Sequence, residues 1–371
     1  MDLSPRDLAR YNRHLKLPGF GIEGQVRLKQ SRVLLIGAGG LGCPIGLYLA
    51  GAGVGSIDVV DFDMIEISNL QRQIAHATES EGQPKAQSLV DAMHQLNPTL
   101  NYTAHQRRLD ASWIMGILKQ VDLVIDGTDN YQTRYMVADA CHLAGKPLVY
   151  GAIHQFDAQL SLFEAGKGPC YRCLFPQPPD PADTPNCSDA GVLGVLPGVV
   201  GVMMATEAVK YLAGLGQTLA GVLALYNAFE QSIRHIRLNR DPGCPLCGDT
   251  PSITTVEEMD FTCETEPAAP EVDVHQAKEM IGEGAGLLDV REEMEWATCH
   301  IDGARLVSVK VMNPDLVSHF SKQKPLLVYC HKGSRSLKAA AMLREWGYDA
   351  ISMAGGIDAW ALTFDKEMPR Y

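Results

Sequence analysis

The stretch SRVLLIGAGGLG, residues 31–42, decides the fold class of this chain. Its apolar half is typical of a strand that is buried on both faces of a sheet. Gly37, Gly39 and Gly42 then form a G-x-G-x-x-G turn before an apolar helix expected at about Leu41–Ala52. Glycines let the backbone approach a phosphate, and the N-terminus of the helix favours anions. The stretch predicts a nucleotide-binding unit, and leaves open ATP, NAD or a tight turn without a ligand.

The neighbouring segments repeat this alternation of buried strand and helix. Further strands are expected in SIDVVDFD (56–63), VDLVIDGTDN (121–130) and PLVYGAI (147–153), and a helix is expected from Pro84 to Leu96. Such alternation predicts a Rossmann-like α/β fold, with a mostly parallel sheet and helices on both faces. Ligands of these sheets bind at the carboxyl ends of the strands.

A second strand–helix alternation follows residue 271. The strand GLLDV (286–290) precedes a helix in REEMEW (291–296), and the strand PLLVYC (325–330) precedes a helix in SLKAAAMLREWG (336–347). This pattern predicts a second, smaller α/β domain.

The net charge of the 371 residues is −12, and it is concentrated in one segment. Residues 249–271 contain seven acidic residues and no Lys or Arg, so they contribute −7. An acidic segment with several prolines is typical of a linker. We therefore expect an ATP-binding domain at 1–248, a linker at 249–271 and the smaller domain at 272–371.

The acidic balance argues against binding to nucleic acid or to an anionic membrane, because both require a basic face. The opening segment MDLSPRDLARYNRH is charged from its second residue, unlike a signal peptide. The uncharged runs 33–57 and 190–206 are interpreted as core segments and not as membrane spans. These features predict a cytoplasmic protein that does not associate with membranes.

Polar side chains follow the predicted strands of the first domain. Asp61 comes 19 residues after Gly42, where an acid can accept hydrogen bonds from ribose hydroxyls. The other residues of this cluster are Ser68, Asn69, Arg72, Lys85, Asp129, Asn130 and Arg134. Cations neutralise the charge that develops on phosphate oxygens, and a carboxylate can hold Mg²⁺. Hydride transfer needs neither cation, so the cluster favours nucleotidyl transfer.

Two Cys-x-x-Cys pairs predict a structural metal site. Cys170 and Cys173 form one pair, and Cys244 and Cys247 form the other. Such a set of thiolates is typical of tetrahedral Zn²⁺ with no open coordination position. Disulfides are disfavoured in a reducing compartment. We therefore expect one bound zinc and no catalysis at these cysteines.

The loop CHKGSR between a predicted strand and a predicted helix indicates thiolate chemistry. Its residues are Cys330, His331, Lys332, Gly333, Ser334 and Arg335. We expect backbone N–H groups to surround the Cys330 sulfur, with the helix N-terminus and Arg335 adding positive potential. These surroundings would stabilise a thiolate or a persulfide anion. A phosphatase-type loop is the alternative, and it would also require a general acid.

The two parts of the chain resemble two known families. Residues 1–248 resemble the ubiquitin-activating-enzyme-like adenylyltransferases that serve sulfur carrier proteins. The matching stretches are RYNRH (10–14), GAGGLG (37–42), DFD (61–63), SNLQRQ (68–73), GQPK (82–85), DGTDN (126–130), PCYRC (169–173) and PGCPLCG (242–248). Residues 272–371 resemble a rhodanese domain, and the matching stretches are LLDVREEMEW (287–296), HIDGA (300–304), the Cys330 loop and GGIDAW (355–360).

The first resemblance implies an ATP–Mg²⁺ site and a homodimer. The residues that it implies for ATP and Mg²⁺ are Gly40, Asp61, Asn69, Arg72, Lys85 and Asp129, to which the motifs add Gly37, Gly39, Ser68 and Asn130. Arg13 resembles a residue that reaches the nucleotide of the partner subunit, so the active enzyme is expected to be a homodimer.

Three positions bear on sulfur transfer. Cys187 lies in a Pro-rich loop at the place of the family's crossover-loop cysteine, and is a candidate to resolve an acyl disulfide. Cys299 replaces the glycine usual before His300, and is interpreted as a stray thiol. Arg335 ends the loop as in thiosulfate-using rhodaneses, whereas fused eukaryotic relatives often carry an acid there. The sulfur donor is thus left open between thiosulfate and a cysteine desulfurase.

The reading that combines these features is a two-step enzyme. The first domain is expected to adenylate the C-terminal glycine of a ubiquitin-like sulfur carrier that ends in Gly-Gly. A persulfide on Cys330 is then expected to produce a thiocarboxylate, with Arg72, Asp129 and Cys187 assisting. The pathway is expected to be of the molybdopterin or thiamine type. The alternatives are an NAD-dependent oxidoreductase and a non-catalytic scaffold for a carrier and a desulfurase.

Overall fold

The computed structural model describes residues 3–178, 191–257 and 269–370. The chain divides into two compact units, Met1–Phe261 and Thr262–Tyr371. Each unit is described separately.

Unit 1 is built on an eight-stranded sheet with the order β3-β2-β1-β4-β5-β6-β7-β8. The strands from β3 to β5 run parallel, whereas β5 to β8 are joined by antiparallel pairing. The strand bounds are β1 (Arg32–Ile36), β2 (Ser56–Val60), β3 (Asn101–His105), β4 (Leu123–Asp126), β5 (Leu148–His154), β6 (Asp157–Phe163), β7 (Val222–Asn227) and β8 (Ser232–Arg237). The predicted Rossmann-like class is confirmed, and it is extended by an antiparallel half.

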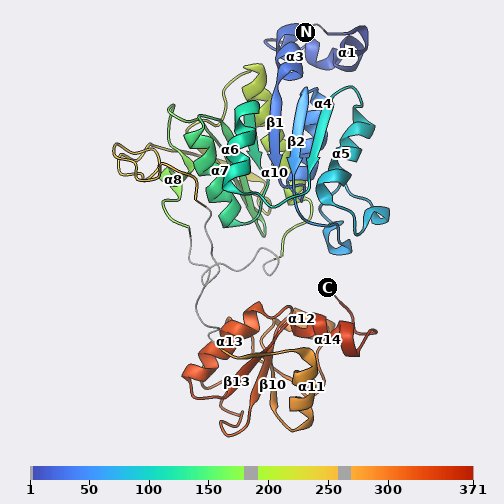
Figure 1. The fold of residues 1–371 in the computed structure, drawn as a ribbon, viewed down its shortest axis with the longest axis vertical. Helices are drawn as coiled ribbons and strands as arrows, with labels where there is room; N and C mark the ends of the chain where they lie inside the picture. The colour runs from blue at the N-terminus through green and yellow to red at the C-terminus, as the bar shows by residue number, and fades with distance from the viewer. Residues whose placement is uncertain (1–2, 179–190, 258–268, 371) are drawn as a thin grey trace. The chain divides into compact units, whose positions relative to one another are not determined.

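Helices cover both faces of this sheet (Figure 1). Alternate residues of β1 show the two layers: Val33 and Leu35 pack in one apolar cluster, and Leu34 and Ile36 pack in another. The first cluster lies under α3 (Gly21–Gln30), α4 (Gly42–Ala52), α5 (Lys85–Leu96) and α10 (Leu196–Ala213). The second lies under α6 (Ala111–Ile117), α7 (Tyr131–Leu143) and α8 (Tyr171–Leu174).

Short helices complete unit 1. Their bounds are α1 (Pro5–Arg10), α2 (Asn12–Leu15), η1 (Ile67–Asn69), η2 (Thr78–Ser80) and η3 (Leu118–Gln120). Helix α1 begins with a capping box, because the Ser4 hydroxyl accepts from the Asp7 N–H and the Asp7 carboxylate accepts from the Ser4 N–H.

Among the described residues, α10 is the one helix long and apolar enough to cross a membrane. Half of it is buried inside the unit, and its residues Leu196, Val200 and Met204 belong to the first apolar cluster.

Unit 2 is a smaller α/β layer structure. Its five-stranded sheet has the order β11-β10-β12-β13-β9, and every pairing is parallel. The strands are β9 (Glu271–Val272), β10 (Gly286–Asp289), β11 (Arg305–Leu306), β12 (Leu326–Tyr329) and β13 (Ala350–Met353). The helices are α11 (Val274–Gly282), α12 (Glu293–Thr298), α13 (Ser334–Glu345) and α14 (Gly356–Phe364). Separate apolar clusters on the two faces of the sheet confirm the predicted second α/β layer structure.

Candidate functional site

A cavity of about 460 Å³ opens at the carboxyl ends of β1, β2, β4 and β5. This volume lies in the range of small-molecule sites. The predicted ATP residues in its wall are Gly37, Gly39, Gly40, Asp61, Arg72, Lys85, Asp129 and Asn130. Segments that are far apart in sequence therefore meet at one edge of the sheet, as the strand ends of a parallel sheet require.

Two glycines shape the turn that forms the cavity floor. Gly37 has a φ of 90°, which L side chains rarely adopt. A Cβ atom at Gly42 would lie 1.9 Å from the carbonyl oxygen of Gly37. The first turn of α4 can approach the end of β1 only because Gly42 has no side chain.

Asp61 is tied to the Gly-rich turn. Its Oδ2 accepts a hydrogen bond of 2.8 Å from the Ala38 N–H, and its Oδ1 accepts one of 2.8 Å from the Asp63 N–H. Burial raises the pKa of this carboxyl group. Each oxygen retains a lone pair, so Asp61 can still accept from ribose hydroxyls.

Lys85 is paired with an acid that the sequence reasoning did not select. Its Nζ lies 3.0 Å from Oδ2 of Asp63, and both residues line the cavity. The Lys85 side chain is 9% exposed and that of Asp63 is 48% exposed, so the ammonium group is held at the wall by a more solvated partner. The D-x-D spacing after β2 was the available signal for Asp63.

Ser68 and Asn69 are not part of the cavity wall, and they support the segment that carries Arg72. Oδ1 of Asn69 accepts from the Glu66 N–H at 3.1 Å and caps η1. Arg72 donates to the Ser68 carbonyl oxygen at 3.1 Å, and the Ser68 hydroxyl donates to Glu66 at 3.3 Å. Ser68 and Asn69 therefore lie beside the cavity, on the segment that carries Arg72.

The loop that presents Asp129 is fixed by a buried ion pair. Oδ1 of Asp126 accepts from the N–H and the hydroxyl of Thr128, at 2.9 and 2.6 Å. Arg134 donates to the Thr128 carbonyl oxygen at 2.8 Å, and its Nε lies 3.8 Å from Oδ2 of Asp126. Asn130 caps α7 through the Thr133 N–H. Burial raises the pKa of Asp126.

The cavity wall fits a nucleotide in one further respect. Gln73 is buried and lines the cavity, yet its Oε1 has no hydrogen-bond partner within the described part of the chain. A buried carbonyl oxygen without a donor is costly. A ligand or a water in the cavity would supply that donor.

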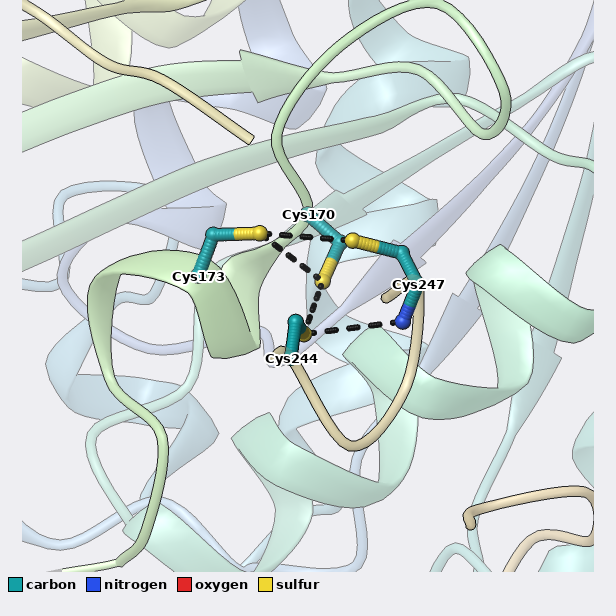
Figure 2. A group of neighbouring side chains, drawn as sticks. All are labelled: Cys170, Cys173, Cys244 and Cys247. Carbon is teal, nitrogen blue, oxygen red and sulfur yellow. Dashed lines mark hydrogen bonds between the residues drawn. The ribbon is translucent and has the colours of Figure 1, made fainter. Parts of the chain in front are cut away.

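The four predicted zinc ligands converge in unit 1 (Figure 2). Their sulfur atoms all lie within 4.8 Å of one another. The sulfurs of Cys170 and Cys244 are 3.5 Å apart, those of Cys173 and Cys247 are 3.3 Å apart, and those of Cys170 and Cys173 are 3.9 Å apart. Zn–S bonds of about 2.3 Å give a tetrahedron with edges of about 3.8 Å. The donor set and its spacing fit Zn²⁺.

A buried ion pair connects this cluster to α7. Arg172 lies between Cys170 and Cys173, and its Nε and Nη2 each donate to a carboxylate oxygen of Asp139 at 2.7 Å. Both side chains are buried. A bidentate pair of this kind fixes orientation as well as distance.

In unit 2, Cys330 follows β12 directly and is fully buried. Its Sγ accepts from the Gly333 N–H at 3.1 Å and from the Ser336 hydroxyl at 3.5 Å. Gly333 has a φ of 106° at the start of α13, so the loop turns back over the sulfur. The first turn of α14 supports the loop, because the N–H groups of Ile357 and Asp358 donate to the carbonyls of Cys330 and His331.

Arg335 was expected to add positive potential at the Cys330 sulfur, but the structure pairs it with a carboxylate. Its guanidinium forms a bidentate pair with Glu295 of α12, at 2.7 and 2.8 Å. Both side chains are less than one-fifth exposed. The positive charge of Arg335 is therefore compensated by a carboxylate, which the sequence reasoning did not identify.

The remaining predicted residues lie away from these groups or outside the described residues. Arg13 is exposed on α2 and is not part of the cavity wall. Cys299 packs in an apolar cluster of unit 2, where its carbonyl accepts from Arg291 at 2.8 Å. Cys187 lies outside the described residues.

Comparisons with known proteins match one family model to each of the two units. The ThiF family matches residues 11–246, and the rhodanese-like domain matches residues 273–363. The chain is 41% identical to the probable adenylyltransferase/sulfurtransferase MoeZ of Mycobacterium tuberculosis, over 100% of this chain and 96% of that protein. It is 48% identical to the sulfur carrier protein adenylyltransferase of Thermus thermophilus, over 71% of this chain and 99% of that protein.

A solved structure shares the fold of the larger part. A crystal structure of Escherichia coli MccB with succinimide has a TM-score of 0.57 and 21% identity, covering 64% of this chain and 74% of that chain. At that identity the likeness concerns the fold alone. The two family models and the two relatives decide the assignment: the chain belongs to the ThiF family, and it joins an adenylyltransferase domain to a rhodanese-like sulfurtransferase domain.

Proposed function

We propose that this enzyme adenylates the C-terminal glycine of a ubiquitin-like sulfur carrier and then converts it to a thiocarboxylate. The observation that carries the proposal is the meeting of Arg72, Lys85 and Asp129 around the Gly-rich turn, in one chain with a cysteine loop. The T. thermophilus relative is named a sulfur carrier protein adenylyltransferase, which supports the choice of acyl substrate.

In the first step, a carboxylate oxygen of the carrier attacks the α-phosphorus of ATP. The bond between the α-phosphorus and the bridging oxygen to the β-phosphate breaks, and pyrophosphate leaves. Arg72 and Lys85 stabilise the charge that accumulates on the phosphate oxygens. Lys85 exchanges its pairing with Asp63 for the triphosphate. Asp129 would hold Mg²⁺, which when bound neutralises phosphate charge. Arg13 is proposed to assist from the partner subunit of a homodimer.

In the second step, the terminal sulfur of a Cys330 persulfide attacks the carbonyl carbon of the acyl-adenylate and AMP leaves. The product is an acyl disulfide between the carrier and Cys330. Attack of the Cys187 thiolate on Sγ of Cys330 would then release the carrier thiocarboxylate and leave a Cys187–Cys330 disulfide. A dithiol reductant must restore both thiols. The Gly333 N–H stabilises the sulfur anion that is held or released at Cys330.

The four-cysteine cluster is proposed to bind one Zn²⁺ with a structural role. The sulfur donor is proposed to be thiosulfate or a cysteine desulfurase persulfide, and the pathway to be of the molybdopterin or thiamine type. The protein is proposed to act in the cytoplasm.

The test separates the two steps. Asp129→Ala should abolish carrier-dependent ATP–pyrophosphate exchange. Cys330→Ala should retain exchange and lose thiocarboxylate formation, which mass spectrometry detects in the wild type as the replacement of one carrier oxygen by sulfur. Asp157→Ala is the matched control, because Asp157 lines the same cavity but pairs with Asn227. Unchanged exchange in the Asp129 variant would refute the proposal that Asp129 holds Mg²⁺ in the adenylation step. Thiocarboxylate formation by the Cys330 variant would refute the second step.

A further inference from the structure

A buried histidine that does not line the cavity forms a hydrogen bond with the Gly-rich turn. His76 lies between η1 and η2, and its ring is buried. Nε2 lies 2.9 Å from the carbonyl oxygen of Ala38, and Nδ1 lies 3.0 Å from the Ser88 hydroxyl on α5. His76 is absent from the cavity wall and from the residues selected by sequence reasoning. The imidazole thus bridges α5 to the turn that forms the cavity floor.

The two hydrogen bonds define one tautomer. A carbonyl oxygen can only accept, so Nε2 must carry the hydrogen that lies toward Ala38. In the neutral ring, Nδ1 then accepts from the Ser88 hydroxyl. Burial lowers the pKa of His76 and favours this neutral form. Cys43 is the further neighbour of this pair, because its Sγ lies 3.4 Å from the Ala38 carbonyl oxygen and 3.6 Å from Nε2 of His76, and burial raises the pKa of that thiol to about 12. A protonated thiol there is a weak second donor.

The hydrogen bonds constrain the peptides on both sides of Ala38. The Ala38 N–H donates to Asp61, and the Ala38 carbonyl accepts from His76. The Ala38 carbonyl and the Gly39 N–H are the two ends of one planar trans peptide, so they point in opposite directions. Gly39 lines the cavity, and within the described chain its N–H has no protein acceptor. Holding the carbonyl against His76 therefore directs the Gly39 N–H toward the cavity.

We propose that His76 is a positioning residue for adenylation, which fixes the Ala38–Gly39 peptide so that the Gly39 N–H is presented to the ATP phosphates. The inference rests on the proposed function for the identity of the ligand. His76 acts through the peptide and does not touch the nucleotide.

The test compares two substitutions of similar size. His76→Phe removes the Nε2 donor, whereas the side-chain amide of His76→Gln can replace that donor. The Phe variant should raise the ATP KM in carrier-dependent exchange, and the Kd for MgATP in calorimetry, by about tenfold, the effect of one lost buried hydrogen bond. The Gln variant should restore both values to within about threefold of wild type, and the carrier KM should stay unchanged in both variants.

A control and an independent readout keep the test decisive. His142 is a partly buried histidine on α7 that does not line the cavity, so His142→Phe should leave the ATP KM unchanged. If His76→Phe fails to fold, the wild-type enzyme labelled with ¹⁵N-histidine still reports the tautomer by NMR, and a proton on Nδ1 with none on Nε2 would overturn the proposal.

Three outcomes would each contradict one part of the argument: the positioning role of His76, its role as a donor, or the proposed function. A folded Phe variant with a wild-type ATP KM and MgATP Kd would overturn the positioning role. Equal losses in the Phe and Gln variants would assign His76 to packing alone and overturn the donor role. Absence of exchange in the wild type would instead contradict the proposed function, and the MgATP Kd values would still decide the role of His76.

Discussion

Substitution of Gly42 by alanine tests whether the Gly-rich turn works through close approach of backbone to backbone. The added methyl carbon would lie 1.9 Å from the Gly37 carbonyl oxygen and 2.8 Å from its carbonyl carbon. Ordinary contact begins at 3.4 Å, so the two segments must separate by about 1.5 Å. The Gly37 N–H is bonded to Val60 at 2.9 Å, which anchors that side. The displacement must therefore fall mainly on the first turn of α4.

That displacement should affect catalysis more than folding. Misplacement of a binding group by about 1 Å costs about 10²-fold in rate, whereas overpacking costs about 1–3 kcal/mol of stability. We expect Gly42→Ala to lower kcat/KM for ATP in carrier-dependent exchange by about 10²-fold, with the protein still folded. Steady-state exchange and thermal unfolding measure the two effects on the same sample.

The matched control is Gly116→Ala in α6, where an added Cβ meets nothing within 4 Å. It should leave exchange unchanged and raise the unfolding free energy by about 0.5–1 kcal/mol, because alanine loses less backbone entropy on folding. Wild-type kinetics in a folded Gly42→Ala variant would refute the argument from close approach.

Three further outcomes follow from the geometry of unit 1. Cys244→Ser should lower the zinc content measured by mass spectrometry from one to near zero per chain, and a retained zinc would contradict the ligand assignment. Asp139→Asn should cost about 3 kcal/mol in denaturant unfolding because it leaves the Arg172 charge buried without a carboxylate, and a loss below about 1 kcal/mol would contradict this. Burial alone would raise the pKa of Asp58, but hydrogen bonds from Arg32 and His105 hold it below its usual value. The stability it contributes should be present above about pH 4 and lost as the pH falls through the lower folded pKa. Asp58→Asn should flatten that acid limb of unfolding free energy against pH, and an unchanged limb would show that other groups cause it.

In the parallel half of unit 1, strands β1, β2, β4 and β5 were predictable because they are almost wholly buried. The VLLI run of β1 and all four residues of β4 are buried, and each lies beside a turn signal. The parallel edge strand β3 reads NYTAH and was not predicted, because its residues are exposed or half-buried. The antiparallel half was not predicted. Strand β8 (Ser232–Arg237) reads SIRHIR, and it is almost wholly exposed at the sheet edge. Its partner β7 is specified by pairing across the sheet, and local periodicity carries little of that information.

Site residues could be predicted where they follow a buried strand, and they were missed where their partners are distant in sequence. Asp61 and Asp129 follow buried strands, so their position at the strand ends could be inferred from sequence order. Glu295 and His76 were missed because their partners, Arg335 and Ala38, are 40 and 38 residues away in sequence. No spacing rule connects such pairs. The local role of Asn69 was also not predicted: it belongs to a matching motif, and in the structure its Oδ1 accepts from the Glu66 N–H and caps η1.

The Glu295–Arg335 pair also changes the account of how the cysteine loop favours an anion. A guanidinium in a bidentate pair with a carboxylate adds little net field at the neighbouring sulfur. The donors that the described structure places at Cys330 Sγ are the Gly333 N–H at 3.1 Å and the Ser336 hydroxyl at 3.5 Å, and the peptide dipoles at the start of α13 add to them. Neither donor belongs to the side chain of Arg335, so both persist whichever side chain ends the loop. Arg335 instead ties the loop to α12 through Glu295, and holds in place the turn from which the backbone donor acts.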